Sequence, residues 1–355
     1  MMLSKKAIIF GIIIIIFIAV FIWKQVFAWT PKIRDDKGSI KPNSIASLEK
    51  TKIGGMDQWI LLRGNDISNP VLLWLHGGPG APLMPVARHY NGALESEFII
   101  VQWDQRGAGK SNPLDFDEQT MTFEQFCGDT HELTQYLKKR FNKEKIYLVG
   151  HSWGTQIGSK VAYDYPNDYY AYIAVSQVVD PSIGNEIAHT WLQKEIDLSG
   201  NQAHLKRLKD LGTPPYTEHE DFVSFIKMVD SYGGGMDIGM DKLALIALKS
   251  PEYRLSDYYS WLKGANRGSG PMWKSSLSFN VFQQSPRFLM PVYFFNGVKD
   301  YNTPLELVEK YYEVLDAPKG KYLVRFENSA HAPFMQEAEK FNNELVRTKK
   351  ETYKK

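Results

Sequence analysis

The chain has 355 residues, of which 43% are hydrophobic and 23% are charged, and its formal net charge at pH 7 is +2. This composition is that of an ordinary globular protein with a sizeable core, and so small a net charge gives no electrostatic basis for binding nucleic acid. Cys127 is the only cysteine in the sequence, which excludes an intramolecular disulfide. Because apolar residues around Cys127 recur at helical spacing, we expect a buried, unreactive thiol.

Residues 1–29 begin with Lys5 and Lys6, which precede an uninterrupted apolar run from Ala7 to Trp23. A run of this length is at the low end of what crosses a bilayer, and the bulky residues around Val26-x-Ala28 make a poor cleavage site. We therefore predict an uncleaved signal anchor that forms a transmembrane helix, with a cleaved signal peptide as the alternative. The lysines place the N-terminus in the cytoplasm. We thus expect a single-pass cell-membrane protein whose remaining chain lies on the extracellular side, and the lack of disulfides favours a bacterial surface.

Residues 30–47 are polar, contain two prolines and a glycine, and are predicted to form a linker. Beyond them, strand-like and helix-like segments alternate, which predicts a mostly parallel sheet with helices on both faces. The expected strands lie at 58–62, 71–75, 98–103, 145–149, 172–179, 291–296 and 321–326, and the expected helices begin at Thr122, Thr155, Pro304 and Pro333. The charged tail after Arg347 is predicted to fray.

The alternation breaks in the middle of the chain, where the pattern is mostly helical and rich in Tyr, Trp and Met. We interpret residues 182–286 as a helical cap inserted into a core domain whose two parts are 48–181 and 287–355. A cap of this kind covers the site on the core below it.

Residues 150–154 form a G-x-S-x-G sequence, Gly-His-Ser-Trp-Gly. It directly follows the apolar run 145–149 and precedes the helix-like stretch 155–165. A strand-to-helix turn of this type holds its serine in a strained backbone conformation with the hydroxyl exposed, and its glycines are needed because a Cβ would collide with the turn. Ser152 is therefore the candidate nucleophile.

A serine nucleophile needs a base and an acid, which follow it along the chain in the order acid, then histidine. Asp300 and His331 lie just after the strands 291–296 and 321–326, at the strand ends where ligand sites of open α/β sheets form. We predict the catalytic triad Ser152, Asp300 and His331. Asp180, which follows the strand 172–179, is the alternative acid, and His151 is expected to pack locally.

The developing negative charge of an acyl-transfer reaction needs hydrogen-bond donors. We predict that the backbone N–H groups of Trp153, at the start of a helix, and of Gly78, in the glycine-rich turn 76–80, form this oxyanion hole. His76 is expected to be a structural hydrogen-bonding residue. The sequence has neither a His/Cys ligand cluster nor a phosphate-binding glycine loop, so we expect no metal and no cofactor.

Three motifs together resemble the proline iminopeptidase (prolyl aminopeptidase) family of α/β-hydrolases: HGGPG at 76–80, DQRGAGKS at 104–111 and GHSWG at 150–154. The resemblance covers about 53–180 and 291–344. It implies an eight-stranded, mostly parallel α/β-hydrolase fold with a helical cap, and an enzyme that releases N-terminal residues, often proline, from peptides. It also implies that Ser152, Asp300 and His331 are the triad and that residues 104–107 brace the loops beneath the site.

The chain departs from the family pattern at two places. Family members usually have glycine where His151 stands, and an arginine-glycine pair soon after the strand that here ends in Val178-Val179-Asp180. An aminopeptidase also needs cap carboxylates for the substrate ammonium, because a buried unpaired charge is costly. We predict Glu186 and Glu195 for this role, ahead of Glu218 and Glu220.

The predicted function is therefore that of a membrane-anchored serine hydrolase that cleaves an amide bond through an acyl-enzyme, an aminopeptidase of the proline iminopeptidase type. Its partners are a peptide or small acyl substrate and the membrane; no oligomeric state follows from the sequence. An esterase, lactonase or amidase that acts on a neutral substrate is the alternative. The missing arginine-glycine pair and the aromatic residues Tyr258, Tyr259 and Trp261 favour it. A non-catalytic binding protein is disfavoured because no triad member is missing.

Overall fold

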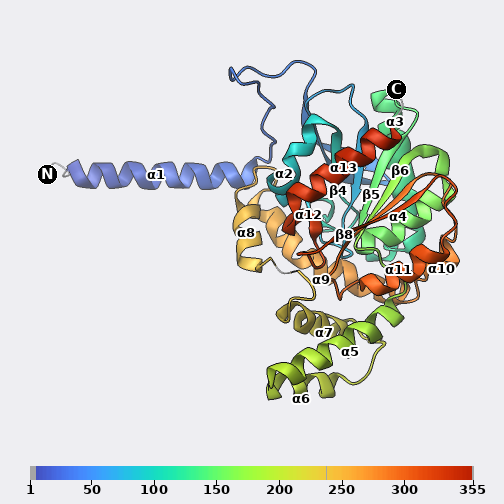
Figure 1. The fold of residues 1–355 in the computed structure, drawn as a ribbon. Coiled ribbons are helices and arrows are strands. Elements are labelled where there is room, and N and C mark those ends of the chain that lie inside the picture. The colour runs from blue at the N-terminus through green and yellow to red at the C-terminus, as the bar shows by residue number, and fades with distance from the viewer. Residues whose placement is uncertain (1–4, 237, 354–355) are drawn as a thin grey trace.

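The computed structural model describes residues 5–236 and 238–353, a long N-terminal helix followed by a domain built on one twisted sheet (Figure 1). The strand order is β1-β2-β4-β3-β5-β6-β7-β8. β2 is antiparallel to β1 and β4, and all other neighbours are parallel, which confirms the predicted eight-stranded, mostly parallel sheet. The strands are β1 (Ile45–Ile53), β2 (Met56–Gly64), β3 (Val71–Leu75), β4 (Ile99–Asp104), β5 (Ile146–His151), β6 (Tyr169–Val175), β7 (Val292–Gly297) and β8 (Lys321–Phe326).

Helices cover both faces of the sheet. Their bounds are α1 (Lys5–Val26), α2 (Met84–Asn91), α3 (Phe123–Phe141), α4 (Trp153–Asp164), α5 (Pro181–Ser199), α6 (Gln202–Leu211), α7 (His219–Ser231), α8 (Met240–Leu248), α9 (Leu255–Leu277), α10 (Val281–Gln284), α11 (Leu305–Val314), α12 (Pro333–Gln336) and α13 (Ala338–Thr352). Helix ends carry the expected signals: the Thr122 side chain caps the start of α3, and Asn142, in a left-handed conformation, ends it.

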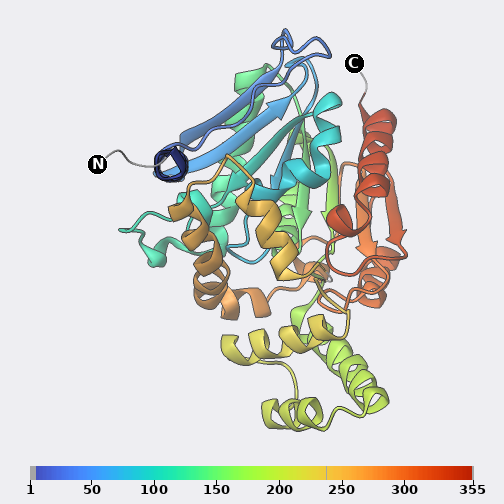
Figure 2. The same cartoon turned by 90° about the vertical axis from the view of Figure 1, so that its left-hand side faces the viewer.

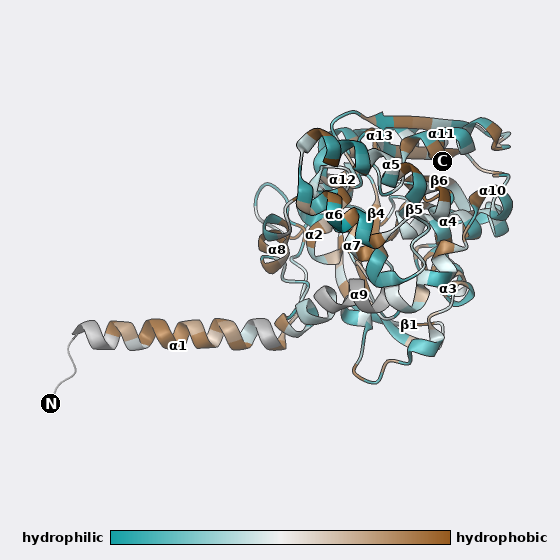
Figure 3. Ribbon diagram, turned by 90° about the horizontal axis from the view of Figure 1, so that it is seen from below, coloured by the Kyte–Doolittle hydropathy of each residue, from teal (hydrophilic) through white to brown (hydrophobic). Residues whose placement is uncertain are grey.

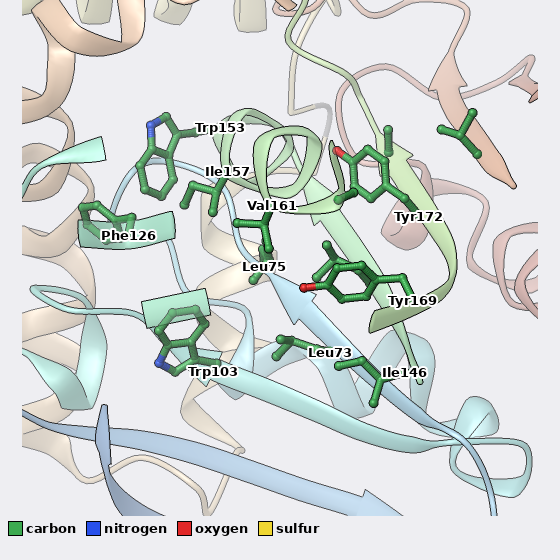
Figure 4. Packing of buried hydrophobic residues seen from close by; sticks show 14 of the residues in the cluster. Leu73, Leu75, Trp103, Phe126, Ile146, Trp153, Ile157, Val161, Tyr169 and Tyr172 are labelled. Carbon is green, nitrogen blue, oxygen red and sulfur yellow. The ribbon is translucent and has the colours of Figure 1, made fainter. Parts of the chain in front are cut away.

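The core consists of two apolar layers, one on each face of the sheet. Because side chains alternate along a strand, Leu73 and Leu75 of β3 join the cluster that includes α3, α4 and α11, whereas Leu72 and Trp74 join the cluster that includes α2, α12 and α13. Figure 4 shows Leu73 and Leu75 among the large side chains of the first layer. Burying β3 on both faces fixes the position of the turn that follows it.

Helices α5 to α10 are inserted between β6 and β7 and form the cap, which lies at one end of the sheet (Figure 2). Helices α5, α6 and α7 share an apolar cluster of their own, centred on Leu192 and Phe225. The segment leading into α9 is bound to the core by buried polar contacts. Tyr253 donates a hydrogen bond to Asp104 Oδ2 at 2.6 Å, and Lys110 pairs with Asp257 at 2.6 Å.

The segment 30–47 differs from the predicted linker at both of its ends. β1 begins at Ile45 and pairs with β2 along its whole length, so the last residues of the predicted linker belong to the sheet. At the other end, Arg63 donates hydrogen bonds to Thr30 Oγ1 at 2.6 Å and to Pro31 O at 2.7 Å. The start of the segment is thus bound to the domain.

The tail after Arg347 was expected to fray, but α13 continues to Thr352. Lys349 Nζ reaches the Glu97 carboxylate at 2.9 Å, and the Tyr147 and Thr352 hydroxyls lie 2.8 Å apart. These contacts with the core stabilise a charged helix end that the sequence pattern alone assigns to solvent.

The N-terminal apolar run forms α1, which projects away from the domain (Figure 1) and is hydrophobic over most of its length (Figure 3). Within the part of the chain that the structure describes, however, no helix combines the length and the hydropathy that crossing a bilayer requires. The predicted helix is therefore present, and a membrane span is not found.

Candidate active site

Ser152 lies at the turn between β5 and α4, with φ of 53° and ψ of −125°. Few non-glycine residues adopt positive φ, and those that do cluster at functional sites. The flanking glycines are required by close backbone contacts: a Cβ at Gly150 would lie 2.6 Å from Gly154 O, and a Cβ at Gly154 would lie 2.5 Å from Leu75 O. The structure thus contains the tight strand-to-helix turn that the G-x-S-x-G sequence predicts.

The structure brings Ser152, His331 and Asp300 into one hydrogen-bonded chain. His331 Nε2 lies 2.8 Å from Ser152 Oγ, and His331 Nδ1 lies 3.0 Å from Asp300 Oδ2. Asp300 follows β7 and His331 follows β8, so two neighbouring parallel strands deliver the acid and the base to the same edge of the sheet. The alternative acid, Asp180, instead caps α5, where its Oδ1 accepts hydrogen bonds from two backbone N–H groups.

Asp300 is buried and held by several donors. Its Oδ1 accepts hydrogen bonds from the N–H groups of Asn302 and Thr303, both at 2.9 Å, and its Oδ2 accepts one from Thr303 Oγ1 at 2.7 Å. Burial alone raises the pKa of Asp300, but the attraction of His331 and these hydrogen bonds outweigh it and hold the pKa below the usual value. Asp300 is therefore a carboxylate at neutral pH.

The same contacts act on His331 with the opposite sign. Burial lowers the pKa of His331, but the charge and hydrogen bond of Asp300, together with the charge of Asp230, outweigh it, so the pKa lies above its ordinary value. His331 is thus a stronger base than a free histidine, and its Nε2 faces the serine hydroxyl.

His151 packs locally, as its sequence position suggested. Its Nε2 lies 2.9 Å from the carbonyl oxygen of His331, which also accepts a hydrogen bond from Ser176 Oγ at 3.0 Å. Burial, reinforced by the neighbouring His331, lowers the pKa of His151 to about 3, so the ring is neutral. A neutral ring that contacts this carbonyl through Nε2 is protonated there and donates. His151 therefore holds the backbone that carries the base.

The turn after β3 lies beside the nucleophile. Gly78 has φ of 115°, and a Cβ on Gly77 would lie 3.0 Å from the Cβ of Ser152. Gly77, Gly78 and Trp153 line the same cavity as Ser152, so the residues predicted to form the oxyanion hole lie on the same cavity wall as the candidate nucleophile. His76 is structural: it accepts a hydrogen bond from the Gln105 N–H at 3.2 Å, and burial lowers its pKa to about 4.

The motif at 104–107 braces these loops. Arg106 and Asp129 form a buried ion pair at 2.7 Å, and Arg106 also donates to Gly54 O at 3.1 Å. Asp104 accepts hydrogen bonds from the Lys110 N–H and from Tyr253, and burial raises its pKa to about 7. These contacts agree with the structural role that the resemblance implies. Cys127 is half-buried, less than expected, and the burial of its thiol raises the pKa to about 12.

Ser152 and His331 open into a cavity of about 430 Å³ between core and cap. Most of its wall is apolar; the larger contributing side chains are Leu83, Phe222, Leu243, Trp261, Trp273 and Phe334. Of the three cap aromatics named from the sequence, Trp261 lines the cavity, Tyr258 is buried against backbone carbonyls and Tyr259 is exposed. Among the described residues, no three His, Cys, Asp or Glu side chains gather as a metal site.

The structure does not bring the predicted cap carboxylates to the cavity, because neither Glu186 nor Glu195 is among the residues that line it. Asn185 lines it, whereas Glu186 is one position further around α5 and is exposed. Glu195 is ten residues from Asn185, which is about 15 Å along a helix. Only residues at the start of α5 line the cavity, and the rest of this long helix lies away from it.

Asp230, at the end of α7, is the acidic residue near the triad that the sequence reasoning missed. Its Oδ1 accepts a hydrogen bond from the Met236 N–H at 3.0 Å, and its charge interacts with those of His331 and Asp300. The turn after it returns to the triad, where the His331 N–H donates to Gly235 O at 3.2 Å. The only signal in the sequence that the chain after Asp230 returns to the triad is the glycine run that follows this residue.

The sheet order, the strained serine turn and the serine–histidine–aspartate chain define an α/β-hydrolase. The crystal structure of a proline iminopeptidase from Mycobacterium smegmatis has the same fold, with a TM-score of 0.61 and 17% identity over 86% of this chain and 98% of that one. Residues 93–224 match the family model of serine aminopeptidases, S33.

Two relatives are more similar to this chain in sequence than that crystal structure is, and they show the family. The probable aminopeptidase YbaC of Bacillus subtilis is 35% identical over 308 residues, 86% of this chain and 96% of that protein. The proline iminopeptidase of Heyndrickxia coagulans is 27% identical over 280 residues, 78% of this chain and 89% of that protein. The chain belongs to the proline iminopeptidase-like family of α/β-hydrolases, and it is an enzyme of the serine hydrolase superfamily.

Proposed function

We propose that this protein is an aminopeptidase of the proline iminopeptidase type that cleaves the amide bond after the N-terminal residue of a peptide. The observation that carries the proposal is the continuous contact from Ser152 Oγ through His331 to Asp300, next to two backbone N–H groups in a cavity. The aminopeptidase and proline iminopeptidase names of the relatives support the choice of substrate.

In the proposed mechanism, His331 Nε2 accepts the proton of Ser152 as Oγ attacks the carbonyl carbon of the substrate. Asp300 stabilises the imidazolium that forms, and the N–H groups of Gly78 and Trp153 stabilise the oxyanion. His331 then protonates the leaving amine, which departs and leaves the acyl-enzyme. A water molecule that gives its proton to His331 attacks the ester, and the reverse transfer restores Ser152.

We assign recognition of the substrate ammonium to Asp230, which does not itself line the cavity but accepts a hydrogen bond from the backbone of Met236, a residue of the cavity wall. Its charge acts on the triad, and burial raises its own pKa. A buried carboxylate of this kind gains from pairing with a cation. We expect Asp230→Asn to raise KM for substrates with a free amine and to leave N-blocked substrates unchanged. An equal change in KM for both would remove Asp230 from this role.

Turnover of proline naphthylamide and of its N-blocked analogue tests the aminopeptidase assignment. The free amine is expected to be cleaved at least roughly tenfold faster, a difference of about 1.4 kcal/mol. Ser152→Ala should abolish both turnover and labelling by a fluorophosphonate, which reacts only with an activated serine. Unchanged turnover in that variant would refute the proposed nucleophile.

The mostly apolar wall of the cavity favours a second candidate function, an esterase, lactonase or amidase with a neutral substrate. The same serine chemistry serves both functions. Equal turnover of the free and the blocked substrate would support this candidate in place of the aminopeptidase.

We further propose that α1 attaches the protein to a cell membrane, with the enzyme domain outside a bacterial cell. Most of its described apolar side chains face solvent; Phe17 is 75% exposed and Ile15 is 67% exposed. An exposed apolar surface of this extent marks contact with a membrane or another protein. At the base of α1, the Trp29 N–H donates to Pro251 O at 3.0 Å, which fixes the helix to the cap.

Cell fractionation tests the attachment. The full chain is expected in the membrane fraction, and deletion of residues 1–26 should release the enzyme in soluble form with unchanged kcat/KM. External protease should degrade the domain on intact cells. A full chain that remains soluble would contradict attachment, and a domain protected from external protease would contradict the orientation.

A further inference from the structure

We propose that Asn185 and Asn302 bind a second amide group of the substrate, distinct from the amide that is cleaved. The inference deepens the proposed function and rests on it. Both residues line the cavity that holds Ser152. They come from different parts of the fold, Asn185 from the start of α5 in the cap and Asn302 from the loop between β7 and α11 in the core.

Each asparagine has a buried polar atom that lacks a hydrogen-bond partner among the described residues. These atoms are Nδ2 of Asn185, whose residue is only 5% exposed, and Oδ1 of Asn302. Native structures keep few such atoms, because leaving a buried polar group unpaired destabilises the fold. Two of them in one substrate cavity are explained if the substrate supplies the missing partners.

Other polar side chains of the cavity wall are already engaged or turned into the protein. Gln156 donates to Ser276 Oγ at 2.9 Å. Trp153 also has an unpaired nitrogen, but its ring packs edge-on against the buried Phe126 at 4.8 Å. His151 Nε2 is held against the His331 carbonyl, and its unpaired Nδ1 faces the backbone of Gly77, where a Cβ would lie 3.2 Å from it. Asn185 and Asn302 therefore remain as the pair that can orient a substrate group within an apolar wall.

The chemistry of the pair selects the ligand. Nδ2 of Asn185 is a donor and Oδ1 of Asn302 is an acceptor, which together match the carbonyl and the N–H of one amide. The backbone that carries the acceptor is held in place, because the Asn302 N–H donates to Asp300 Oδ1 at 2.9 Å and the neighbouring Tyr301 N–H donates to Gly234 O at 2.8 Å. The loop that carries the triad acid thus also positions this group.

Two substrate features could supply the second amide: the side chain of an N-terminal glutamine, or the next peptide bond of a longer chain. Three matched substrates separate them: methionine anilide, which has only the scissile amide, glutamine anilide, and methionyl-glycyl-glycine. We expect at least one of the last two to exceed methionine anilide in kcat/KM by roughly tenfold, the effect of satisfying a buried polar pair. The substrate that does so identifies the source.

The variants Asn185→Leu and Asn302→Leu keep the side-chain size and remove the amide. Each is expected to abolish most of that preference, mainly by raising KM, and Asn185→Leu is expected to leave methionine anilide within about twofold. Gln193→Leu is the control, since Gln193 lies on the same helix outside the cavity wall and bonds to Asp197 at 3.0 Å. The control should keep the wild-type preference.

Thermal unfolding without substrate gives a readout that does not depend on activity. Because Asn185→Leu removes an unpaired buried group, its Tm should equal or exceed that of the wild type. A fall of several degrees would show a structural role and overturn the proposal. So would a wild-type enzyme without preference among the three substrates, or variants that lose all three equally.

Failure of the aminopeptidase assignment itself would look different. In that case the wild type cleaves neither the three substrates nor proline naphthylamide. Whenever the three substrates are not cleaved, calorimetry on the Ser152→Ala protein decides the question. At least one of two differences in affinity should remain. Glutaminamide should bind more tightly than methioninamide, or methionyl-glycyl-glycine should bind more tightly than methionine anilide. Asn185→Leu should remove whichever difference is found. Equal binding within both pairs would overturn the amide site.

Discussion

Replacing Asp300 with asparagine tests the hydrogen-bond logic of the site, because the two carboxylate oxygens have different partners. Oδ1 accepts two backbone N–H groups, from Asn302 and Thr303. Oδ2 accepts the Thr303 hydroxyl and is the oxygen nearer to His331 Nδ1, at 3.0 Å against 3.2 Å for Oδ1. In the variant, the amide oxygen should take the Oδ1 position, where two donors require an acceptor.

The NH2 group of the variant would then face His331 Nδ1 and donate to it. His331 would have to carry its proton on Nε2, the atom that lies 2.8 Å from Ser152 Oγ. A protonated Nε2 cannot accept the serine proton. We therefore expect kcat to fall by roughly 10⁴-fold, about 5.4 kcal/mol of transition-state stabilisation, as when the orienting acid of a serine protease is made an amide.

Steady-state kinetics on proline naphthylamide measures this loss, with Asp180→Asn as the matched control. Asp180 is the alternative acid of the sequence analysis, and it caps α5 in the structure. Asparagine caps helices about as well as aspartate, so kcat of the control should stay within about twofold of the wild type. A variant at Asp300 that retains a tenth of the activity, or a control that loses as much, would refute the reasoning.

The kcat/KM profile should fall as the pH is lowered through the pKa of His331, which is raised above 6.5, because the protonated ring cannot act as a base; an acidic midpoint below 6.5 would contradict this. Gly154→Ala should lower both Tm and kcat, since its Cβ would lie 2.5 Å from a backbone oxygen of β3, at an overpacking cost of about 1–3 kcal/mol. Gly128→Ala, on an open helix face, should instead raise the free energy of unfolding by about 0.5–1 kcal/mol. A Gly154→Ala protein with the Tm and kcat of the wild type would refute the steric argument. Lys110→Met should lower the free energy of unfolding by about 1.5–3 kcal/mol, because it removes one of the two cations, Lys110 and Arg254, that pair with the buried Asp257; urea denaturation that shows a loss below about 1 kcal/mol would count against it.

Much of the fold could be predicted because the signals are local. The strands 71–75 and 321–326 match β3 and β8 at both ends, since short apolar or alternating runs bounded by turns specify strands. The strand predicted at 172–179 is shifted: β6 spans Tyr169–Val175, and Ser176, with φ of 53°, leaves the sheet. An apolar pattern that continues past the last paired residue cannot reveal that change of direction.

Errors in the site arose where distance along the chain and distance in space diverge. Glu186 and Glu195 belong to the segment that enters the cap, yet the orientation and length of α5 keep them from the cavity wall. Asp230 reaches the triad because the glycine turn after α7 folds back on His331. No periodicity encodes such a return, since it depends on how the cap packs on the core.

The sequence by itself predicted the candidate nucleophile, its base and the class of chemistry, because the serine turn and the strands are encoded in short contiguous segments and the triad members follow one another in a fixed order along the chain. Only the tertiary structure decided between Asp300 and Asp180. Both follow a strand, but β7 lies next to β8, so Asp300 meets His331, whereas Asp180 is taken up by the start of α5. It also brought Asn185 and Asn302 to one cavity from positions 117 residues apart, because packing of the cap on the core sets which side chains can contact the substrate.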